Sequence, residues 1–483
     1  MRPQRMRLAG GGRIDRSQLY AFTFNGTQYQ GYAGDTLAAA LIANGVRLVG
    51  RSFKLHRPRG IFSAGAEEPS AIVQVEAGAS TLPNLRATQV ELYDGLSATG
   101  VNAWPSLAFD FWSINSLFAP LLPAGFYYKT FMWPQSLWHT YEAVIRRAAG
   151  LGRAPEHPDP DIYDHMHLHC DVLVVGGGPA GLAAALKAGR TGARVVLVDE
   201  QNESGGQLLG NRQQIDGAPG AEWATSAAEE LAALDDVRVL TRTTAFGHYD
   251  HNHVALIERR TDHLGPAVSD ADRRDGGPRQ RVWKVRAKQV VLATGAHERS
   301  IVFRNNDRPG VMQASAAACY VNRYAARPGH RAVIFTNNDS ANAAAADLAE
   351  GGVSVAANVA ARPEPGLDAS ALAAGQGIEV ITGHAAVDVK GRRHVEAVSI
   401  AAVDEAGNAA ASASRSINCD LLAVSGGWNP CVHLHCHSGG KLNFDAVQAC
   451  FVPGESKLAV RAAGAAAGIF DLAGCLELSL IHI

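Results

Sequence analysis

Features that would place this 483-residue chain in a simple class are missing from its sequence. Its seven cysteines are scattered and include no Cys-x-x-Cys pair, so we expect no redox-active dithiol. An odd number of scattered cysteines favours a reducing cytoplasm over a disulfide framework, which predicts a cytoplasmic protein. The first 169 residues contain no cysteine, and an iron–sulfur cluster needs thiolate ligands. We therefore expect no such cluster in that part of the chain.

The sequence also has no excess of charge of one sign and no long apolar run. The net charge is −2 and the pI is near 6.8, so no basic stripe for binding nucleic acid is expected. No apolar run reaches about 18 residues, which argues against a membrane-spanning helix. The start, MRPQRMRLAGGGR, is basic but no apolar stretch follows it, so we infer no secretory signal.

The stretch from residue 170 to residue 200, CDVLVVGGGPAGLAAALKAGRTGARVVLVDE, carries the clearest motif. An apolar run typical of a strand leads into Gly176, Gly178 and Gly181, spaced as G-x-G-x-x-G at the start of an Ala- and Leu-rich helix. A second apolar run ends in Asp199 and Glu200, about 20 residues past the glycines. This order of strand, glycine turn, helix, strand and acid predicts a dinucleotide-binding unit.

Each part of the motif has a physical role. Gly176 permits the tight turn, Gly178 lets backbone N–H groups approach a pyrophosphate, and Gly181 lets the helix lie against the sheet. The helix N-terminus supplies unpaired N–H donors and the positive end of the helix dipole. Asp199 or Glu200 would accept a hydrogen bond from a ribose hydroxyl, which favours FAD or NAD over a 2′-phosphorylated nucleotide.

Later segments are expected to complete the nucleotide site. The loop ESGGQLLG, which includes Gly206, lies where such folds pass the ribose and phosphates. Residues 237–240 predict the third parallel strand, and Ala245, just past it, lies where the backbone commonly meets an adenine. Near residue 290 a strand ends in ATG, so that Thr294 and Gly295 form a tight turn beside the cofactor.

The N-terminal part predicts a β-grasp unit of ferredoxin type without a cluster. LYAFTFNGTQYQGY alternates apolar and polar residues about an Asn-Gly pair, which is a strong hairpin signal. Asp35 is expected to cap a helix from Thr36 to Asn44. An apolar β-run follows at residues 71–75.

Residues 97–169 form a connecting segment rich in aromatic residues and proline. Hydrophobic packing of this segment over its neighbours is one explanation. A surface for a flavin or a partner polypeptide is the other, because large aromatic side chains are more numerous than one wrapping loop needs. The residues concerned are Trp104, Phe126, Tyr127, Tyr128 and Trp133.

Residues 331–412 predict an inserted second nucleotide-type unit. It has a strand, RAVIFT, a helix from Ser340 to Glu350, and a strand, VSVAANV. The turn before the helix carries Asn337, Asn338 and Asp339 in place of glycines, so an acid would lie near the phosphates. We therefore expect one occupied dinucleotide site, not two.

Histidines and cysteines cluster in two places, but neither cluster predicts a metal site. In CVHLHCH, positions 431, 433, 435 and 437 would share one face if the segment were extended, yet their spacing matches no zinc template. His165, His167 and His169 alternate in the same way and are better explained as solvated or hydrogen-bonded side chains. Nothing offers a nucleophile with a base at useful spacing, so no catalytic residue is assigned.

The end of the chain, KLAVRAAGAAAGIFDLAGCLELSLIHI, predicts a strand, a turn of small residues and a helix that starts near Asp471. In two-dinucleotide flavoproteins the last such helix points its N-terminus at the pyrophosphate. Ala467, Leu472 and Gly474 are therefore candidate contacts. The apolar, uncapped ending suggests a truncated reading frame.

These segments together predict an α/β chain. Its main part is a two-dinucleotide-binding fold of the FAD/NAD(P)-type Rossmann flavoprotein kind, preceded by a β-grasp domain that resembles a 2Fe–2S ferredoxin without its cluster. The expected boundaries are 1–96 for the β-grasp domain, 97–169 for the connecting segment, 170–330 with 413–483 for the Rossmann domain, and 331–412 for a degenerate insertion.

Stretches along the whole chain carry a specific family likeness: GDTLAAALIANGVRLVGRSFKLHRPRGIFSAG, PAGFYYKTFMWP, HCDVLVVGGGPAGLAAA, NDRPGVMQA and SGGWNPCVHLHCHSGGKL. In these stretches the chain resembles the alpha subunit of bacterial heterotetrameric sarcosine oxidase, an oxidoreductase. The resemblance implies a cytoplasmic complex of alpha, beta, gamma and delta subunits that demethylates sarcosine to glycine. Oxygen then becomes hydrogen peroxide, and the one-carbon unit passes to tetrahydrofolate to give 5,10-methylenetetrahydrofolate.

The resemblance also implies cofactors. NAD is held tightly by the alpha subunit without a redox role, whereas FAD and covalently attached FMN belong to the beta subunit or to its boundary with alpha. The NAD contacts that it implies are Ala180, Asp199, Glu200, Gln201, Gln207, Ala245, Ala467, Leu472 and Gly474. The full candidate set also contains Gly176, Gly178, Pro179, Gly181, Gly206, Thr294 and Gly295.

One departure limits the resemblance, and other interpretations stay open. The family's alpha subunit continues into a folate-binding domain that this chain lacks, so folate transfer is not assigned here and the fragment alone is expected to be inactive. One alternative is the large subunit of an opine- or cyanide-related amino-acid dehydrogenase, which the missing cysteines disfavour. The others are a free-standing FAD/NAD(P)-dependent oxidoreductase and a scaffold that a bound nucleotide stabilises.

Overall fold

The computed structural model describes residues 4–122, 125, 133–149, 152–266, 277–364, 377–409 and 414–481. The chain forms two compact units. Unit 1 comprises Met1–Pro160 and Ser300–Ser425, and unit 2 comprises Asp161–Arg299 and Gly426–Ile483. This division into two units does not test the four domain boundaries inferred from the sequence, which stay a prediction.

Unit 1 begins with a five-stranded sheet in the order β2-β1-β7-β5-β6. Its predicted hairpin turns at Asn25 (φ 49°) and Gly26 (φ 74°), both in the left-handed region that a two-residue hairpin loop demands. The elements of this part are β1 (Asp15–Phe24), β2 (Thr27–Ala33), α1 (Leu37–Ala43), β3 (Gly50–Arg51), β4 (Pro58–Arg59), β5 (Ile72–Val75), η1 (Gly78–Ser80), β6 (Leu82–Arg86) and β7 (Ser97–Gly100).

The cap of helix α1 differs from the expectation. Thr36, not Asp35, is the N-cap, and its hydroxyl accepts a hydrogen bond from the N–H of Ala39 at 3.2 Å. The Asp35 carboxylate is 1% exposed and binds the Arg7 guanidinium, with Oδ1 3.0 Å from Nη1. A buried carboxylate needs a charged partner, and the pairing with Arg7 takes Asp35 away from the helix end.

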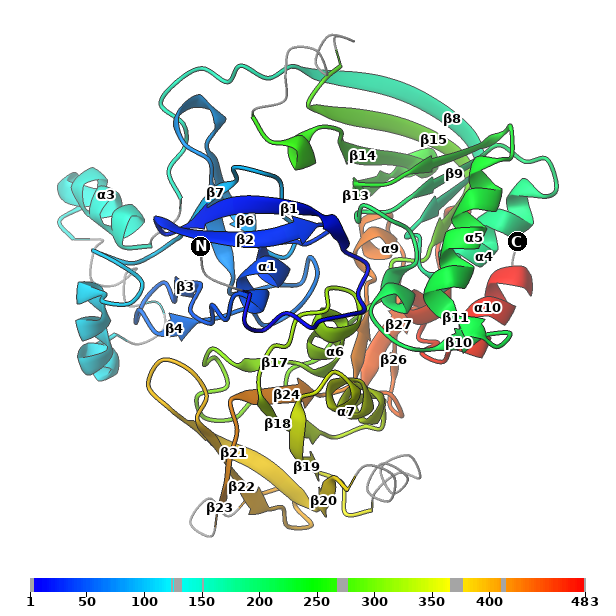
Figure 1. The fold of residues 1–483 in the computed structure, drawn as a ribbon. Helices are drawn as coiled ribbons and strands as arrows, with labels where there is room; N and C mark the ends of the chain where they lie inside the picture. The colour runs from blue at the N-terminus through cyan, green and yellow to red at the C-terminus, as the bar shows by residue number, and fades with distance from the viewer. Residues whose placement is uncertain are drawn as a thin grey trace. The chain divides into compact units, whose positions relative to one another are not determined.

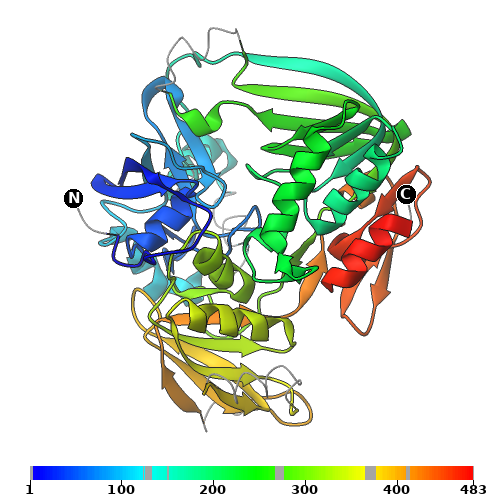
Figure 2. The ribbon, with the colours of Figure 1, turned by 45° about the vertical axis from the view of Figure 1, so that its right-hand side comes forward.

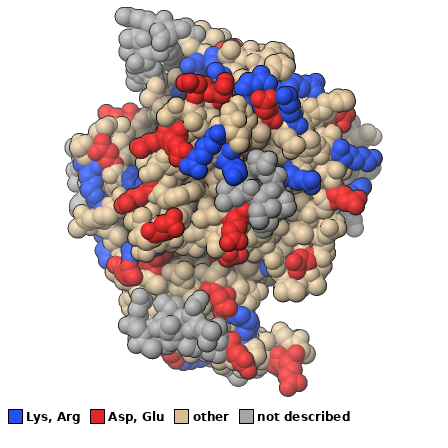
Figure 3. Space-filling model, turned by 90° about the vertical axis from the view of Figure 1, so that its right-hand side faces the viewer, with Lys and Arg blue, Asp and Glu red and all other residues tan. Residues whose placement is uncertain are grey.

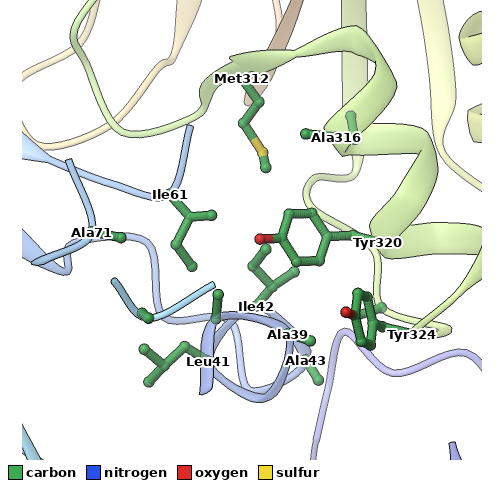
Figure 4. Packing of buried hydrophobic residues seen from close by; sticks show 14 of the residues in the cluster. Ala39, Leu41, Ile42, Ala43, Ile61, Ala71, Met312, Ala316, Tyr320 and Tyr324 are labelled. Carbon is green, nitrogen blue, oxygen red and sulfur yellow. The ribbon is translucent and has the colours of Figure 1, made fainter. Parts of the chain in front are cut away.

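Helix α1 is buried along its whole length and belongs to a core that spans distant parts of unit 1. Figure 4 shows Ile42 and Ala43 of α1 beside Tyr320 and Tyr324. Tyr320 is fully buried, and its hydroxyl donates to the carbonyl of Ser63 at 2.8 Å. Burial of one large apolar side chain stabilises by about 1.5–3 kcal/mol, so this shared core binds the two chain segments of unit 1 into one body.

The second part of unit 1 contains a parallel sheet in the order β17-β24-β18-β19-β20. The strands β21, β22 and β23, which come between β20 and β24 in the sequence, form a separate antiparallel sheet. The predicted strand, helix and strand of residues 331–360 are present as β18, α7 and β19. The elements are β17 (Val311–Gln313), α6 (Ala314–Asn322), β18 (Arg331–Thr336), α7 (Ser340–Glu350), β19 (Ser354–Ala360), β20 (Glu379–Thr382), β21 (His384–Lys390), β22 (Ala397–Ala402), β23 (Arg415–Asn418) and β24 (Leu421–Ser425).

The aromatic segment contains η2 (Phe111–Leu121), η3 (Gln135–Leu137) and α3 (Trp138–Ala149). Trp104 is 60% exposed and Trp133 is 82% exposed, so hydrophobic packing within unit 1 does not account for them. Phe126, Tyr127 and Tyr128 lie outside the described residues.

Unit 2 is built on a sheet in the order β12-β9-β8-β15-β14-β13, with β28 also paired to β15. Strands β12, β9, β8, β15 and β28 run parallel, whereas β14 and β13 continue the sheet antiparallel. Leu173 and Val175 are buried on one face of the sheet and Val174 on the other, as the two-residue period of a strand requires. Figures 1 and 2 show α4, α5 and α10 together beside this sheet.

The elements of unit 2 form this sheet, three separate two-stranded sheets (β10-β11, β16-β25 and β26-β27) and several helices. They are β8 (Tyr163–Val175), α4 (Pro179–Gly189), β9 (Val195–Val198), η4 (Gly206–Leu209), β10 (Gln214–Ile215), β11 (Ala218–Pro219), α5 (Gly220–Ala232), β12 (Val237–Leu240), β13 (Thr243–Tyr249), η5 (Asp250–Asn252), β14 (His253–Arg259), η6 (Asp262–Leu264), β15 (Gln280–Leu292), β16 (Ala296–Glu298), β25 (Trp428–Pro430), α9 (His433–His437), β26 (Leu442–Asp445), β27 (Cys450–Pro453), β28 (Val460–Ala462), η8 (Gly464–Ala467) and α10 (Leu472–Ile481). The predicted α/β class is confirmed.

Acidic and basic side chains are interspersed on the face drawn in Figure 3, with no field of one sign. Within the described part of the chain, no helix combines the length and the apolar character needed to cross a membrane.

Candidate functional site

The carboxyl ends of β8 and β15 lie side by side, because Val175 pairs with Leu292 in the parallel ladder. Gly176 follows β8 with φ +105°, and a Cβ there would lie 2.2 Å from the carbonyl oxygen of Ala293, which follows β15. Only glycine can make this turn without moving the neighbouring strand. The first motif glycine is therefore required by the approach of the two strand ends.

The other two motif glycines face different surroundings. A Cβ on Gly181 would lie 1.8 Å from the carbonyl oxygen of Gly176, so helix α4 packs directly on the end of the strand. A Cβ on Gly178 would meet nothing closer than the Cα of Gly206, 4.0 Å away. Gly178 is also the N-cap of α4, without a side-chain cap, and Pro179 stands at the first helical position. The start of α4 thus keeps N–H donors and room for an anion.

The two acids at the end of β9 have different environments. Asp199 is 9% exposed, and its carboxylate accepts hydrogen bonds from the N–H of Gly177 at 2.6 Å and of Gln201 at 2.8 Å. It braces the glycine loop against the second strand. Glu200 is partly exposed, and its backbone carbonyl accepts from the Arg259 guanidinium at 2.6 Å.

A second glycine loop covers the first. Gly205 donates from its N–H to the carbonyl of Gly177 at 2.7 Å, and a Cβ on Gly206 would lie 2.9 Å from the Cα of Gly178. Both residues have positive φ, so the loop can lie this close only because it is made of glycine. Gln207 follows in η4 and is exposed.

Ser204 is a residue at this site that sequence reasoning missed. Its hydroxyl is buried, has no hydrogen-bond partner among the described residues, and lies 2.9 Å from where a Cβ of Gly177 would be. A buried polar atom without a partner is costly, so a polar group of a ligand would stabilise it. The only sequence signal was its position directly before the Gly205-Gly206 pair.

In the Thr294-Gly295 turn, the Thr294 side chain is hydrogen-bonded within the protein, whereas the space beside Gly295 is open. The Thr294 hydroxyl donates to the carbonyl of Cys431 at 2.8 Å, and the N–H of Cys431 donates back to the carbonyl of Gly295 at 2.9 Å. Gly295 has φ +74°, and a Cβ there would meet nothing within 4 Å. The turn therefore joins two chain segments with Thr294 and leaves space at Gly295.

The C-terminal contacts are only partly arranged as expected. A Cβ on Gly464 would lie 2.7 Å from the Cβ of Ala180, so η8 packs on the first turn of α4. Ala467 ends η8 and Leu472 begins α10. The N–H of Gly474, however, donates to the Asp471 carboxylate at 2.7 Å, so an acid of this chain already caps that helix.

Ala245 comes shortly after the third parallel strand, and its contact with an adenine stays a prediction. The third parallel strand, β12, ends at Leu240, and Ala245 lies within the antiparallel strand β13, opposite Leu256 of β14. Its strand is nevertheless tied to the site, because the N–H of Thr243 donates to the carbonyl of Asp199 at 2.7 Å. Ala245 is thus near the acid end of β9, at an irregularity of the ladder.

These glycine and acid contacts form one cradle at the carboxyl edge of the unit 2 sheet, defined by Gly176–Gly181, Asp199–Gln201, Ser204–Gln207 and Gly295. Its open face, its helix N-terminus and its buried unpartnered hydroxyl fit a dinucleotide pyrophosphate and ribose. The chemistry available is binding and orientation.

The turn between β18 and α7 in unit 1 differs from this cradle. The Asn338 side-chain oxygen accepts from the N–H of Ser340 at 3.1 Å, and its amide donates to the carbonyl of Ser425 at 3.2 Å. Asp339 forms an ion pair with Arg362. Side chains of the chain itself therefore occupy the place where a phosphate would bind.

The Cys-His segment is helical, not extended. Positions two residues apart do not share a face in α9, which removes the geometry considered for a metal. His435 is buried, with Nε2 2.9 Å from the carbonyl of Lys441, and His437 Nδ1 accepts from the N–H of His248 at 3.1 Å. Burial lowers the pKa of His248. In the described ranges no three His, Cys, Asp or Glu side chains gather as a metal site.

Comparison with known proteins gives a consistent assignment. The sequence model of the family "Pyridine nucleotide-disulphide oxidoreductase" matches residues 170–447, more than half of the chain. That of the "2Fe-2S iron-sulfur cluster binding domain" matches residues 18–103, a segment without cysteine. The N-terminal domain is therefore similar to cluster-binding domains without having cysteine ligands.

Two relatives are similar over almost the whole chain. The alpha subunit of sarcosine oxidase from Rhizobium meliloti (strain 1021) is 48% identical over 97% of this chain and 46% of that protein. The alpha subunit of sarcosine oxidase from Corynebacterium sp. (strain U-96) is 40% identical over 99% of this chain and 44% of that protein. The chain spans less than half the length of either relative.

Other similarities are more distant. An opine oxidase subunit from Agrobacterium tumefaciens (strain Ach5) is 30% identical over only 38% of this chain and 35% of that protein, which disfavours the opine-related alternative. The crystal structure of L-proline dehydrogenase from P. horikoshii superposes with a TM-score of 0.60 at 20% identity, over 96% of this chain and 71% of that one. That likeness supports the fold class.

Proposed function

Because the chain belongs to the pyridine nucleotide-disulphide oxidoreductase family, we propose that its unit 2 cradle binds NAD and that the chain is the NAD-binding part of a sarcosine oxidase alpha subunit. The observation that carries the proposal is the 48% identity to such a subunit over 97% of the chain. The geometry of the cradle supports the proposal. Of the three motif glycines, Gly178 is the one with open space beside it, and this is the glycine that a pyrophosphate is expected to approach.

The proposed contacts divide by chemical role. The N–H groups of Ala180 and Gly181 at the start of α4 bind the pyrophosphate, and Gly178 admits it. Glu200 accepts from a ribose hydroxyl, because Asp199 already accepts two backbone N–H groups. Such an acid also repels a 2′-phosphate, which favours NAD over NADP. The remaining proposed contacts are Gln201, Gln207, Ala245, Ala467, Leu472 and Gly474, with the last through atoms other than its N–H.

The proposed reaction of the complete complex is the oxidative demethylation of sarcosine to glycine, with formation of hydrogen peroxide and 5,10-methylenetetrahydrofolate. Flavin, as FAD and FMN in the beta subunit or at its boundary with this chain, supplies the oxidation chemistry. This chain contributes no proposed catalytic residue. Its role is to hold NAD as a fixed part of the structure and to assemble with beta, gamma and delta subunits in the cytoplasm.

The first test identifies the bound small molecule. The purified chain is denatured, and the released nucleotide is identified by mass. NAD in a ratio near one per chain is the expected result. FAD would favour a free-standing flavoenzyme, and an empty site would contradict nucleotide binding by this chain.

The second test concerns the activity. The chain is co-expressed with the beta, gamma and delta subunits of the Rhizobium meliloti enzyme, and sarcosine-dependent peroxide production is measured. Peroxide that requires this chain supports the proposal. A complex that assembles with NAD but produces no peroxide from sarcosine would refute the substrate assignment alone.

A further inference from the structure

The surface of η2 in unit 1 has its apolar side turned outward. Large apolar side chains of this element and of the residues just before it are between 43% and 76% exposed. We call this set the aromatic face, and its members are Trp104, Phe109, Phe111, Trp112, Ile114, Leu117, Phe118 and Leu121. A helix of a soluble protein normally buries its apolar stripe.

The three-residue repeat of η2 shows that its large apolar side chains, and not its small ones, are exposed. In a 3-10 helix, side chains three apart lie above one another, so Phe111, Ile114 and Leu117 form one ridge. Trp112, Phe118 and Leu121 lie along the next ridge. The third ridge carries only small side chains, at positions 113, 116 and 119, and two of them are partly buried. Positions 113 and 119 are therefore less exposed than the large apolar side chains of the element, which face outward.

A buried polar network holds this arrangement in place. The Asp110 carboxylate is buried, accepts from the N–H of Trp104 at 3.0 Å and of Trp112 at 3.3 Å, and lies 2.7 Å from His56 Nδ1. Arg51 donates to the carbonyl of Leu107 at 2.6 Å. The backbone that carries the exposed rings is thus held in place, and a preordered backbone loses little conformational entropy on binding.

The rings also support one another. Trp104 and Phe111 pack edge to face with centroids 6.0 Å apart, and Phe111 packs in the same way on Trp112 at 6.4 Å. Fixed, exposed tryptophan and phenylalanine side chains are the residue types that carry most binding energy at protein interfaces.

The size and chemistry of the face indicate what covers it. Five of the eight side chains are aromatic, with roughly 150–250 Å² of surface each, and the other three are aliphatic. Because most of the eight are more than half exposed, the face offers on the order of 800 Å². That is the area that each partner of a standard protein interface contributes. Between residues 101 and 122 the only charged residue is the buried Asp110. An anionic membrane or a nucleic acid would need basic residues there, and this stretch has none. Two cations from another segment reach the stretch, but Arg51 and Lys54 donate to the carbonyls of Leu107 and Leu122.

We propose that the aromatic face is the docking surface for another polypeptide of the oxidase complex, which meets it with an apolar, uncharged surface. The proposal rests on the function proposed above, because the similar proteins are named alpha subunits, which implies further subunits in a complex. It adds the place of that contact, which lies in unit 1, whereas the nucleotide cradle lies in unit 2.

The test uses the chain co-expressed with the beta, gamma and delta subunits of the Rhizobium meliloti enzyme. One variant carries Leu117→Ser and Phe118→Ser in the aromatic face. The control carries Phe444→Ser and Val447→Ser, at residues 59% and 96% exposed in the β26–β27 hairpin of unit 2. Recovery of partner subunits on the tagged chain, the mass of the complex in solution, and bound NAD are measured together.

We expect the face variant to lose at least tenfold in partner recovery, while the control keeps wild-type recovery and both keep NAD. Equal recovery for both variants, or equal loss in both, would overturn the proposal. So would a change only in self-association of the chain, or only in binding to neutral lipid vesicles. Absence of NAD with intact, face-dependent docking would instead refute the proposed nucleotide and leave this inference standing.

Discussion

Two adjacent acids, Asp199 and Glu200, have different environments in the cradle. Asp199 uses both carboxylate oxygens on backbone N–H groups of the glycine loop and of Gln201. Glu200, one residue later, is partly exposed. A carboxylate that accepts two N–H groups stabilises a loop, whereas a more exposed one can reach a ligand.

Substitution of the two acids separates these roles. Asp199→Asn replaces an acceptor oxygen by a donor, so we expect lower thermal stability, by about 1–3 kcal/mol, together with loss of NAD. Glu200→Gln should keep the stability and reduce NAD affinity about tenfold, the effect of one charge-assisted hydrogen bond. Glu222→Gln, at an exposed position of α5, serves as the control. Calorimetric titration and thermal unfolding measure the effects, and equal behaviour of the two variants would contradict the division of roles.

The motif glycines allow a similarly sharp comparison. An added Cβ at Gly181 would lie 1.8 Å from a backbone oxygen, so Gly181→Ala is expected to destabilise by more than about 3 kcal/mol. Gly178→Ala has space for its methyl group and no φ strain, so it should fold normally. It should nevertheless lose NAD, because the methyl group takes the room that the pyrophosphate needs. Normal NAD binding by a folded Gly178→Ala variant would refute the placement of the pyrophosphate.

At the scale of elements, the β3–β4 ribbon is tied to the turn before β17 through one carboxylate. Asp307 accepts from Arg57 Nε at 2.6 Å and is also paired with Arg59. Burial by itself raises the pKa of Asp307. The hydrogen bonds and charges of the two guanidinium groups lower the pKa by more than burial raises it, so the net pKa is about 2. The usual value of 3.8 applies to the unfolded chain.

A pH dependence follows from this shift. A group whose pKa is lower in the folded state stabilises fully above its unfolded pKa, and that stabilisation is lost as the pH falls through the folded pKa. We expect Asp307→Asn to lose about 2 kcal/mol at pH 7, and the difference from wild type to shrink below about pH 4. Urea unfolding between pH 7 and pH 3 measures it, with exposed Glu405→Gln as control. A difference that stays constant with pH would show that the ion pairs are not its source.

At the scale of the whole molecule, the two units should respond differently to the nucleotide. A ligand that binds only the folded state at 100 times its Kd adds about 2.7 kcal/mol of stability. We expect NAD to raise the unfolding temperature of unit 2 and NADP to have little effect. Calorimetry of the chain stripped of nucleotide and then reloaded measures this. An equal shift with NADP would contradict the proposed role of Glu200.

The parts of the fold that depend on local pattern could be predicted, and the parts that depend on neighbours could not. The hairpin at Asn25-Gly26 and the strand-turn-helix around Gly176 follow from local backbone requirements. The cap of α1 could not be foreseen, because Arg7 draws Asp35 away from it. Nor could the antiparallel strand β13 that carries Ala245, because a return after β12 has no marker in the sequence.

The sequence by itself determined that a glycine turn joins a strand to a helix, that an acid follows about 20 residues later, and that no thiolate is available in the first 169 residues. These features are set by single residues and short repeats. Tertiary structure alone decided that Asp199 braces the loop, that Ser204 is buried without a partner among the described residues, and that η2 presents its large side chains outward. Each of these depends on which distant segment lies alongside, since burial and hydrogen bonding are properties of neighbours in space and not of neighbours in the chain.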